Sequence, residues 1–193
     1  MNVEILTPIL IAVAALITAG LVTWFAFSMW RSQKLRVKFG AEYDYTLEKA
    51  GNQRAAEETL TEREKRVGNL DIHSLGELES DRYHGEWITI QANFVDDPSK
   101  SIEDANRLIT EVMIARGFPV ADFEQRVADL SVLYPEFVSN YRLANGVALK
   151  NQSSGASTEE LRQAMVYYRS LFDELLEIEE MVVYEREVVS NEQ

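Results

Sequence analysis

The chain has 193 residues, a net charge of −13 and no cysteine, which excludes disulfides, thiolate zinc sites, iron–sulfur clusters and cysteine nucleophiles. The acidity is uneven, because from Phe39 onward 15 basic residues stand against 31 acidic ones, a net charge of −16. A domain of that charge repels phosphate backbones, so we expect no nucleic-acid partner.

The N-terminal segment contains the longest apolar run. Ile9 to Trp30 is 22 residues without a charged side chain, and a helix of that length spans roughly 33 Å, enough for a hydrocarbon core of about 30 Å. Trp24 and Trp30 lie toward its C-terminal end, where indoles prefer the headgroup level. A cleaved signal peptide is the alternative, but it needs a basic N-terminal region and a shorter apolar core. We therefore predict a short extracytoplasmic tail over 1–8 and a transmembrane helix over 9–30.

The charges that flank this run predict its orientation. No lysine or arginine precedes it, whereas four basic residues follow within eight positions: Arg31, Lys34, Arg36 and Lys38. The positive-inside rule then places the N-terminus outside and the C-terminal domain in the cytoplasm. Ala15 and Ala19 have the small-xxx-small spacing of packed membrane helices, so a homo-oligomer through the anchor is an open alternative.

The segment over 31–73 is predicted to be a basic collar with stalk-like helices. Leu35, Phe39, Tyr43 and Leu47 recur every four residues, which predicts one amphipathic helix over Lys34–Lys49. Gln53–Val67 is a second helical stretch with few large apolar residues, and Glu62 and Arg66 are spaced for an i,i+4 ion pair. Gly68 to His73 is predicted to be a linker.

Residues 74–180 carry the patterns of a helical bundle. Helix starts are expected at the capping box Ser74-x-x-Glu77, at Asp97-Pro98 or Ser101, after Pro119, at Pro135, and at the capping box Ser157-x-x-Glu160. Apolar stripes at helical spacing follow these starts, the clearest being Tyr83, Trp87, Ile90, Phe94; Ile102, Ala105, Ile109, Val112, Met113; Phe123, Val127, Leu130; Val138, Tyr141, Leu149; and Leu161, Met165, Tyr168, Phe172, Leu175, Leu176. Asn151–Gly155 is expected to be a loop, and 181–193 an acidic tail. We predict an all-α fold: a transmembrane helix followed by a soluble bundle of about five to seven helices.

No pattern in the chain predicts catalysis. Asp81-x-x-His84 is half of the motif found in metal sites of helical bundles, but the second half is missing because the other histidine, His73, falls in the linker. No nucleophile elbow, phosphate-binding glycine loop or H-E-x-x-H motif occurs. Asp122 and Arg126 are interpreted as a structural ion pair. We therefore predict no enzyme activity, no cofactor, and no catalytic or metal site.

Four aromatic residues are the candidates for a ligand pocket between bundle helices: Tyr83, Trp87, Tyr141 and Tyr168. An aromatic stripe at helical spacing is more typical of a hydrophobic core than of a ligand site. The pocket is therefore the weaker of the two interpretations.

Four motifs resemble a group of bacterial single-pass membrane proteins without an assigned activity. They are Lys34-Leu35-Arg36 with Phe39-Gly40-x-Glu42-Tyr43-Asp44, Phe94 to Pro98, Asp122 to Val132, and Ala156 to Arg169. The resemblance implies a bacterial plasma-membrane location and no particular activity. Members of the group often carry histidine in place of Tyr134 and Tyr167, so these two positions are interpreted as packing or hydrogen-bonding sites.

The anchor, the acidic helical domain and the lack of catalytic motifs together favour a protein-interaction or scaffold module at the cytoplasmic face of the membrane. Its expected partners are the lipid bilayer and a further protein. The alternative function is a small-ligand binding protein or enzyme that uses the aromatic pocket.

Overall fold

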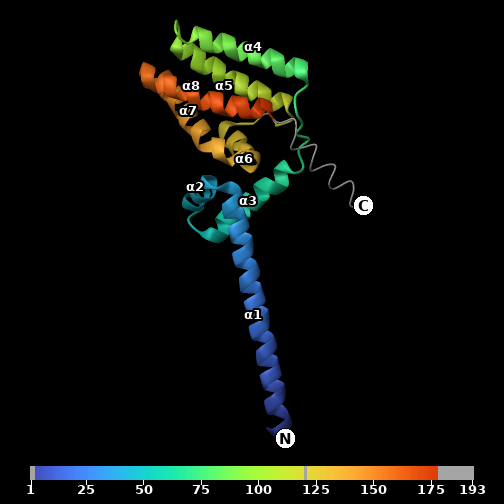
Figure 1. The fold of residues 1–193 in the computed structure, drawn as a ribbon. Helices are drawn as coiled ribbons and strands as arrows, with labels where there is room; N and C mark the ends of the chain where they lie inside the picture. Colours follow the sequence, from blue (N-terminus) through green and yellow to red (C-terminus); the bar gives the residue numbers. More distant parts are fainter. Residues whose placement is uncertain (1–2, 120, 178–193) are drawn as a thin grey trace. The chain divides into compact units, whose positions relative to one another are not determined.

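The computed structural model describes residues 3–119 and 121–177, with side chains from residue 16 onward. Eight α-helices make up the regular structure of this part, which confirms the all-α prediction (Figure 1). They are α1 (Val3–Phe39), α2 (Ala41–Ala50), α3 (Gln53–Val67), α4 (Glu77–Asn93), α5 (Pro98–Ala115), α6 (Phe123–Leu133), α7 (Pro135–Ser154) and α8 (Thr158–Glu177). The chain divides into two compact units, Met1–Leu60 and Thr61–Gln193. The predicted acidic tail over 181–193 lies outside the described residues.

The first unit, Met1–Leu60, is built on the single long helix α1. Between residues 16 and 30 every side chain of α1 is exposed, whereas Leu35 and Phe39 are buried together with Tyr43 of α2 and Leu60 of α3. Among the described side chains of this unit, α2 and the first half of α3 therefore pack against the C-terminal part of α1. No helix whose side chains are described has a stretch that is both long and apolar enough to cross a membrane. The side chains of residues 9–15, which begin the predicted span, lie outside the described residues.

The predicted helix over Lys34–Lys49 is wrong at one position, because the structure divides it at Gly40. This residue has a φ of 50° and a ψ of −126°, a conformation that strongly disfavours any residue with a Cβ. Leu35, Phe39 and Tyr43 are buried, as the four-residue spacing predicted. Because this apolar spacing continues past Gly40, it does not indicate that the helix ends there. The second predicted helix, Gln53–Val67, is confirmed at both ends.

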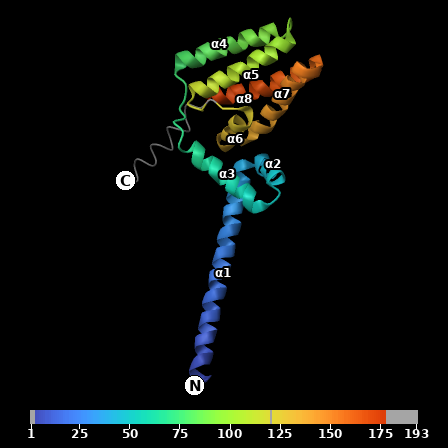
Figure 2. The same cartoon turned by 180° about the vertical axis from the view of Figure 1, so that it is seen from behind.

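The second unit, Thr61–Gln193, stacks its helices in an order that differs from their order in the sequence. The helix α5 packs between α4 and α8, α8 packs between α5 and α7, and α6 packs on α7 (Figures 1 and 2). The faces of α5 and α8 that meet in this stack are those of the predicted stripes, and Ile102, Ile109, Leu161, Tyr168 and Phe172 are all buried. Both central helices are thus specified by apolar residues at helical spacing.

Four of the five predicted helix starts are confirmed, including the start of α6 after Pro119, and one is wrong. The Asp97 carboxylate accepts from the Lys100 backbone N–H at 2.9 Å, with Pro98 in the first turn. Pro135 opens α7. The start of α8 is a reciprocal capping box, in which the Ser157 N–H donates to the Glu160 carboxylate and the Glu160 N–H donates to Ser157 Oγ. In contrast, α4 begins after Gly76 without a side-chain cap, because Leu75 is buried in the core and the chain is still extended at Gly76.

The predicted loop over Asn151–Gly155 is helical up to Ser154. The chain has no glycine or proline between Ala148 and Ser154, and α7 ends at Gly155, whose φ is 83°. Leu149, which was expected on the buried face of this helix, is 56% exposed. That expectation was wrong because the buried face of α7 follows Val138, Tyr141, Ala144 and Ala148.

The capping box that opens α8 predicts a pH dependence. The Glu160 carboxylate accepts from the Lys150 ammonium and from the Ser157 backbone N–H and hydroxyl, and these contacts lower its pKa to about 2 from 4.5. Because the folded-state pKa is lowered, the stabilisation is present above pH 4.5 and is lost as the pH falls toward 2. We expect carboxyl NMR to show Glu160 titrating near pH 2, and a Lys150→Met variant to titrate closer to 4.5. A Lys100→Met control should leave the titration unchanged, and a parent midpoint at 4.5 would contradict the contact.

Candidate functional site

The candidate site in the first unit is a groove of about 1250 Å³ between α1 and α3, here called the α1–α3 groove. Residues 24–36 of α1 form one wall and residues 53–58 of α3 form the other. It is lined by Trp24, Phe25, Phe27, Ser28, Met29, Arg31, Ser32, Gln33, Arg36, Gln53, Arg54, Glu57 and Glu58. Three of the six predicted anchor flanks thus line one groove.

The other three flanks lie around a smaller hollow on α1. Trp30, Lys34 and Lys38 line a cavity of about 390 Å³ together with Gln33 and Val37. Each of the six predicted flanking residues therefore lines one of two cavities of the first unit. Both cavities lie at the C-terminal end of the apolar run. What the sequence did not predict is the α3 wall, which no local pattern of α1 could indicate.

Hydrogen bonds between helices hold the α3 wall of the groove in place. The Gln53 side-chain amide donates to Ser32 Oγ and to Glu57 Oε1, both at 2.8 Å. The Tyr43 hydroxyl donates to the same Glu57 oxygen at 3.0 Å. Burial opposes the ionisation of Glu57, but the bonds from Ser32, Gln53 and Tyr43 and the nearby Arg31 guanidinium hold its pKa below 4.5. The groove therefore contains an ionised carboxylate that is already bound by protein donors.

The four predicted pocket residues, which belong to the second unit, lie in its core. Trp87 stacks on Phe172 with ring centroids 4.6 Å apart, and Tyr141 meets Tyr168 edge-on at 6.1 Å. Tyr83 is also buried, and none of the four lines either cavity of the first unit. Their packing is that of the core stripe, and ligand binding at these residues stays a prediction.

The buried tyrosines of this core differ in how their hydroxyls are satisfied. Within the described residues the Tyr168 hydroxyl has no hydrogen-bond partner, and burial raises the pKa of this phenol, with the neighbouring Tyr141 adding to the shift. The Tyr134 hydroxyl instead accepts from Arg116 Nη1 at 2.8 Å. The interpretation of Tyr134 as a hydrogen-bonding position is therefore confirmed.

This difference predicts opposite results for two equivalent substitutions. Tyr168→Phe should leave the free energy of unfolding unchanged or raise it by up to about 1 kcal/mol, because it removes a buried polar group that has no partner. Tyr134→Phe should lower it by about 1.5–3 kcal/mol, because it leaves a charged donor unsatisfied. Urea unfolding of the full chain in detergent, followed by circular dichroism, measures both. Equal losses in the two variants would contradict the assignment.

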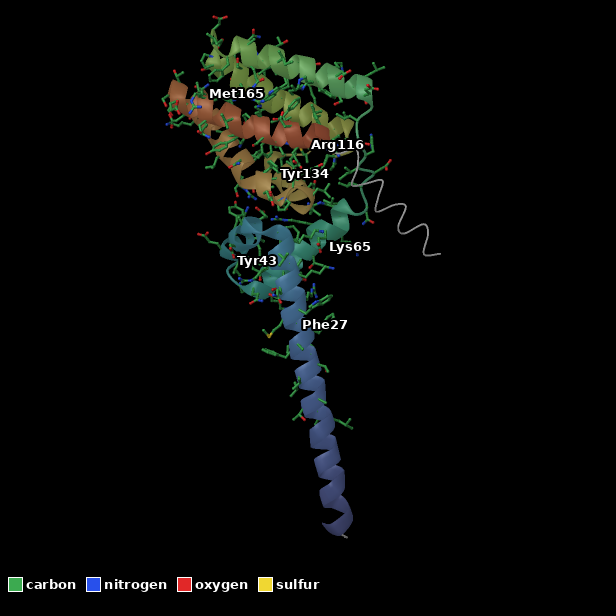
Figure 3. All side chains as sticks on the ribbon, in the orientation of Figure 1. Phe27, Tyr43, Lys65, Arg116, Tyr134 and Met165 are labelled. Atoms are coloured by element: carbon green, nitrogen blue, oxygen red, sulfur yellow. The ribbon has the colours of Figure 1, made fainter. Side chains whose placement is uncertain are left out.

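Arg116, at the C-terminal end of α5, joins three segments of the second unit and is 1% exposed. Its Nη1 donates to Tyr134 Oη and to the Leu175 carbonyl at 2.7 Å, and its Nε donates to the His73 carbonyl at 3.1 Å. Figure 3 labels Arg116 and Tyr134. Arg116 thus joins the C-terminal end of α5 to a backbone carbonyl of α8 and to the segment that precedes α4. Sequence reasoning missed this residue because its partners lie 18 to 59 positions away.

An ion pair between the half-exposed Arg66 and the buried Asp129 joins α3 to α6. The Asp129 carboxylate is 1% exposed and accepts from Arg66 Nε at 2.8 Å and from Gln125 at 3.0 Å. The expected Glu62–Arg66 pair was wrong, because a desolvated carboxylate binds the guanidinium more strongly than an exposed one. The expected Asp122–Arg126 pair was also wrong: Asp122 caps α6, and Arg126 donates to the Ala121 carbonyl at 2.7 Å.

Neither histidine is among the residues that line the α1–α3 groove. His84 is exposed on α4, and His73 Nδ1 lies 2.9 Å from the Asp71 carbonyl. Comparison with known protein families, curated proteins and solved structures gives no match. The family resemblance drawn from the four motifs therefore stays a prediction.

Proposed function

We propose that the chain is a membrane-tethered interaction module, in which residues 9–30 of α1 form a single-pass anchor and the second unit lies in the cytoplasm. The observation that carries the proposal is the exposure of α1. Its large apolar side chains between Leu16 and Trp30 are 58–74% exposed, although the segment has no charge. Leaving that much apolar surface in water is costly, whereas a bilayer would bury it on every side of the helix.

The distribution of charge supports the same proposal. Residues 1–60 carry six basic and six acidic residues, whereas residues 61–193 carry 13 basic and 26 acidic ones. The whole net charge of −13 therefore belongs to the second unit. The basic residues next to the anchor suit an anionic cytoplasmic leaflet, and the acidic unit would be kept away from that leaflet by repulsion. Such a unit is available to a soluble partner.

The partner that this charge favours is a protein with a basic surface. Glu77 and Asp81, one turn apart on α4, are exposed on the same face and offer two carboxylates to one cationic partner. The same residues also suit the positive end of the helix, so their charge does not destabilise the fold. Neutralising them should therefore alter association more than stability.

Site-specific photocrosslinking in living cells tests the proposed interaction. A photoreactive amino acid at Leu78, which is 86% exposed and neighbours Glu77 and Asp81 on the helix, should give a discrete crosslinked product of the full-length chain with one protein. That product should fade in an E77Q/D81N background and persist when Glu103, an exposed residue of α5, is changed to Gln as a control. No product above background, or a product insensitive to E77Q/D81N, would count against an acidic docking surface.

A further inference from the structure

The α1–α3 groove changes in polarity along the axis of α1. Its first residues, from Trp24 to Met29, lie inside the proposed membrane span, and the aromatic rings of Trp24, Phe25 and Phe27 are 61–70% exposed. Its later residues include Arg31 and Arg36, which lie beyond the span. A phospholipid has the same order of polarity, with apolar chains followed by a charged headgroup. Figure 3 shows Phe27 projecting from α1 in this region.

Arg54, on the other wall, is a cation in an electrostatically unfavourable place. It is exposed in the first turn of α3, where the helix carries its positive end, and that turn has no acidic residue. Within the described residues Arg54 makes no ion pair. The Asn52 side chain caps only the Ala55 backbone N–H at 2.9 Å, so the first-turn N–H groups add to the positive potential. This combination favours an anion at the α3 end of the groove.

The other charges of the groove leave this positive potential in place. Glu57 is occupied by donors from Gln53 and Tyr43. The Arg36 guanidinium lies 4.7 Å from the centre of the Tyr43 ring, an interaction that leaves its N–H donors available to a ligand. The groove is lined by three arginines and two glutamates: Arg31, Arg36, Arg54, Glu57 and Glu58. The groove has a net positive charge at the level where headgroup phosphates would lie.

We propose that the α1–α3 groove binds an anionic phospholipid of the cytoplasmic leaflet. Arg54 and Arg36 bind the phosphate, and the aromatic residues Trp24, Phe25 and Phe27 contact the acyl chains. This inference rests on the proposed anchor, because only a chain that spans the membrane brings the groove to the headgroup level. It goes beyond a diffuse basic collar, since it assigns the lipid to one groove and to an arginine on α3.

Tryptophan quenching by brominated lipids tests the inference on the full-length chain. The chain has three tryptophans, and a Trp30→Phe background leaves Trp24 in the groove and Trp87 buried in the second unit. The protein is placed in phosphatidylcholine vesicles that contain a small fraction of either brominated phosphatidylglycerol or brominated phosphatidylcholine. We expect the phosphatidylglycerol to quench more strongly at equal content. Arg54→Gln should lower this preference about fivefold, Arg54→Lys should keep most of it, and Lys34→Gln, which removes one charge outside the groove, should leave it nearly unchanged.

The possible results distinguish a failure of the proposed lipid site from a failure of the proposed anchor. Equal quenching by both lipids, or equal losses in Arg54→Gln and Lys34→Gln, would overturn the groove as a specific site while leaving the anchor standing. An absence of quenching by either lipid would overturn the anchor itself and this inference with it. Excess inorganic phosphate should not reduce the preference, and a reduction would overturn the assignment to a lipid in favour of free phosphate.

Discussion

We expect Arg116→Met to lower the free energy of unfolding by about 3–5 kcal/mol. The substitution keeps much of the side-chain volume but removes the donors that Tyr134, the Leu175 carbonyl and the His73 carbonyl now accept from. Two of these acceptors are backbone carbonyls, those of His73 and Leu175. The cost is therefore that of several buried polar groups left unsatisfied together. Urea unfolding of the full chain in detergent measures it.

Arg107→Met is the matched control for this prediction. Arg107 lies on the same helix and pairs with Glu111 at 2.7 Å, but its side chain is 56% exposed. Exposed ion pairs contribute little, so the loss should stay below about 1 kcal/mol. Similar losses in the two variants would show that Arg116 does not hold the three segments together.

The second large effect is expected in α1. Ile17→Arg combined with Leu21→Arg places two charges close to the middle of the proposed span, at a cost of about 2.5–3.5 kcal/mol for each in an insertion scale. The full chain should resist extraction by alkaline carbonate, and the double variant should be released from the membrane pellet. The physical reason is that a bilayer core offers no partner for either guanidinium.

The control for this experiment keeps both positions apolar. Ile17→Leu with Leu21→Ile should remain in the pellet, because it changes the shape of the helix surface but not its polarity. Retention of the double arginine variant, or release of the unmodified chain, would contradict a membrane-spanning α1. Release of both variants would show that packing and not polarity decides the location.

Much of the fold could be predicted from local sequence because local forces build it. The helices α3, α5 and α8 follow from their apolar spacing, and Asp97 and Ser157 cap their helices as the sequence predicts. Gly40 shows the limit of this reasoning. The apolar stripe through Leu35, Phe39 and Tyr43 is continuous, and only the backbone conformation of the glycine reveals that the helix ends there.

The contacts that join distant segments could not be predicted. Asp129 receives Arg66 from 63 positions away, and Arg116 reaches Leu175 across 59. Arg66 has a nearer partner of ordinary spacing in Glu62, which the structure does not use, whereas Arg116 has no acidic residue three or four positions away in the sequence. The choice is made by burial, since a desolvated polar group must find a partner that the tertiary fold supplies.

One wall of the α1–α3 groove could be predicted from the sequence and the other could not. Hydropathy and charge predict its α1 wall, because Trp24, Arg31 and Arg36 follow directly from the end of an uncharged run. The α3 wall depends on the turn at Gly40 and on the bond from Gln53 to Ser32, which returns the chain to α1. A solvated helix with few large apolar residues gave no local reason to expect that contact.

The orientation of the anchor is the claim on which the proposed function depends, and the absence of cysteine makes it directly measurable. A single cysteine at Ser153, an exposed position of α7, can be labelled with a membrane-impermeant maleimide, with the cysteine-free parent chain as the blank. A cysteine at Thr7 reports the opposite end of the proposed span. In intact cells, freed of any outer wall, we expect labelling at position 7 and labelling at position 153 only after permeabilisation. Labelling at position 153 in intact cells would contradict a cytoplasmic interaction module.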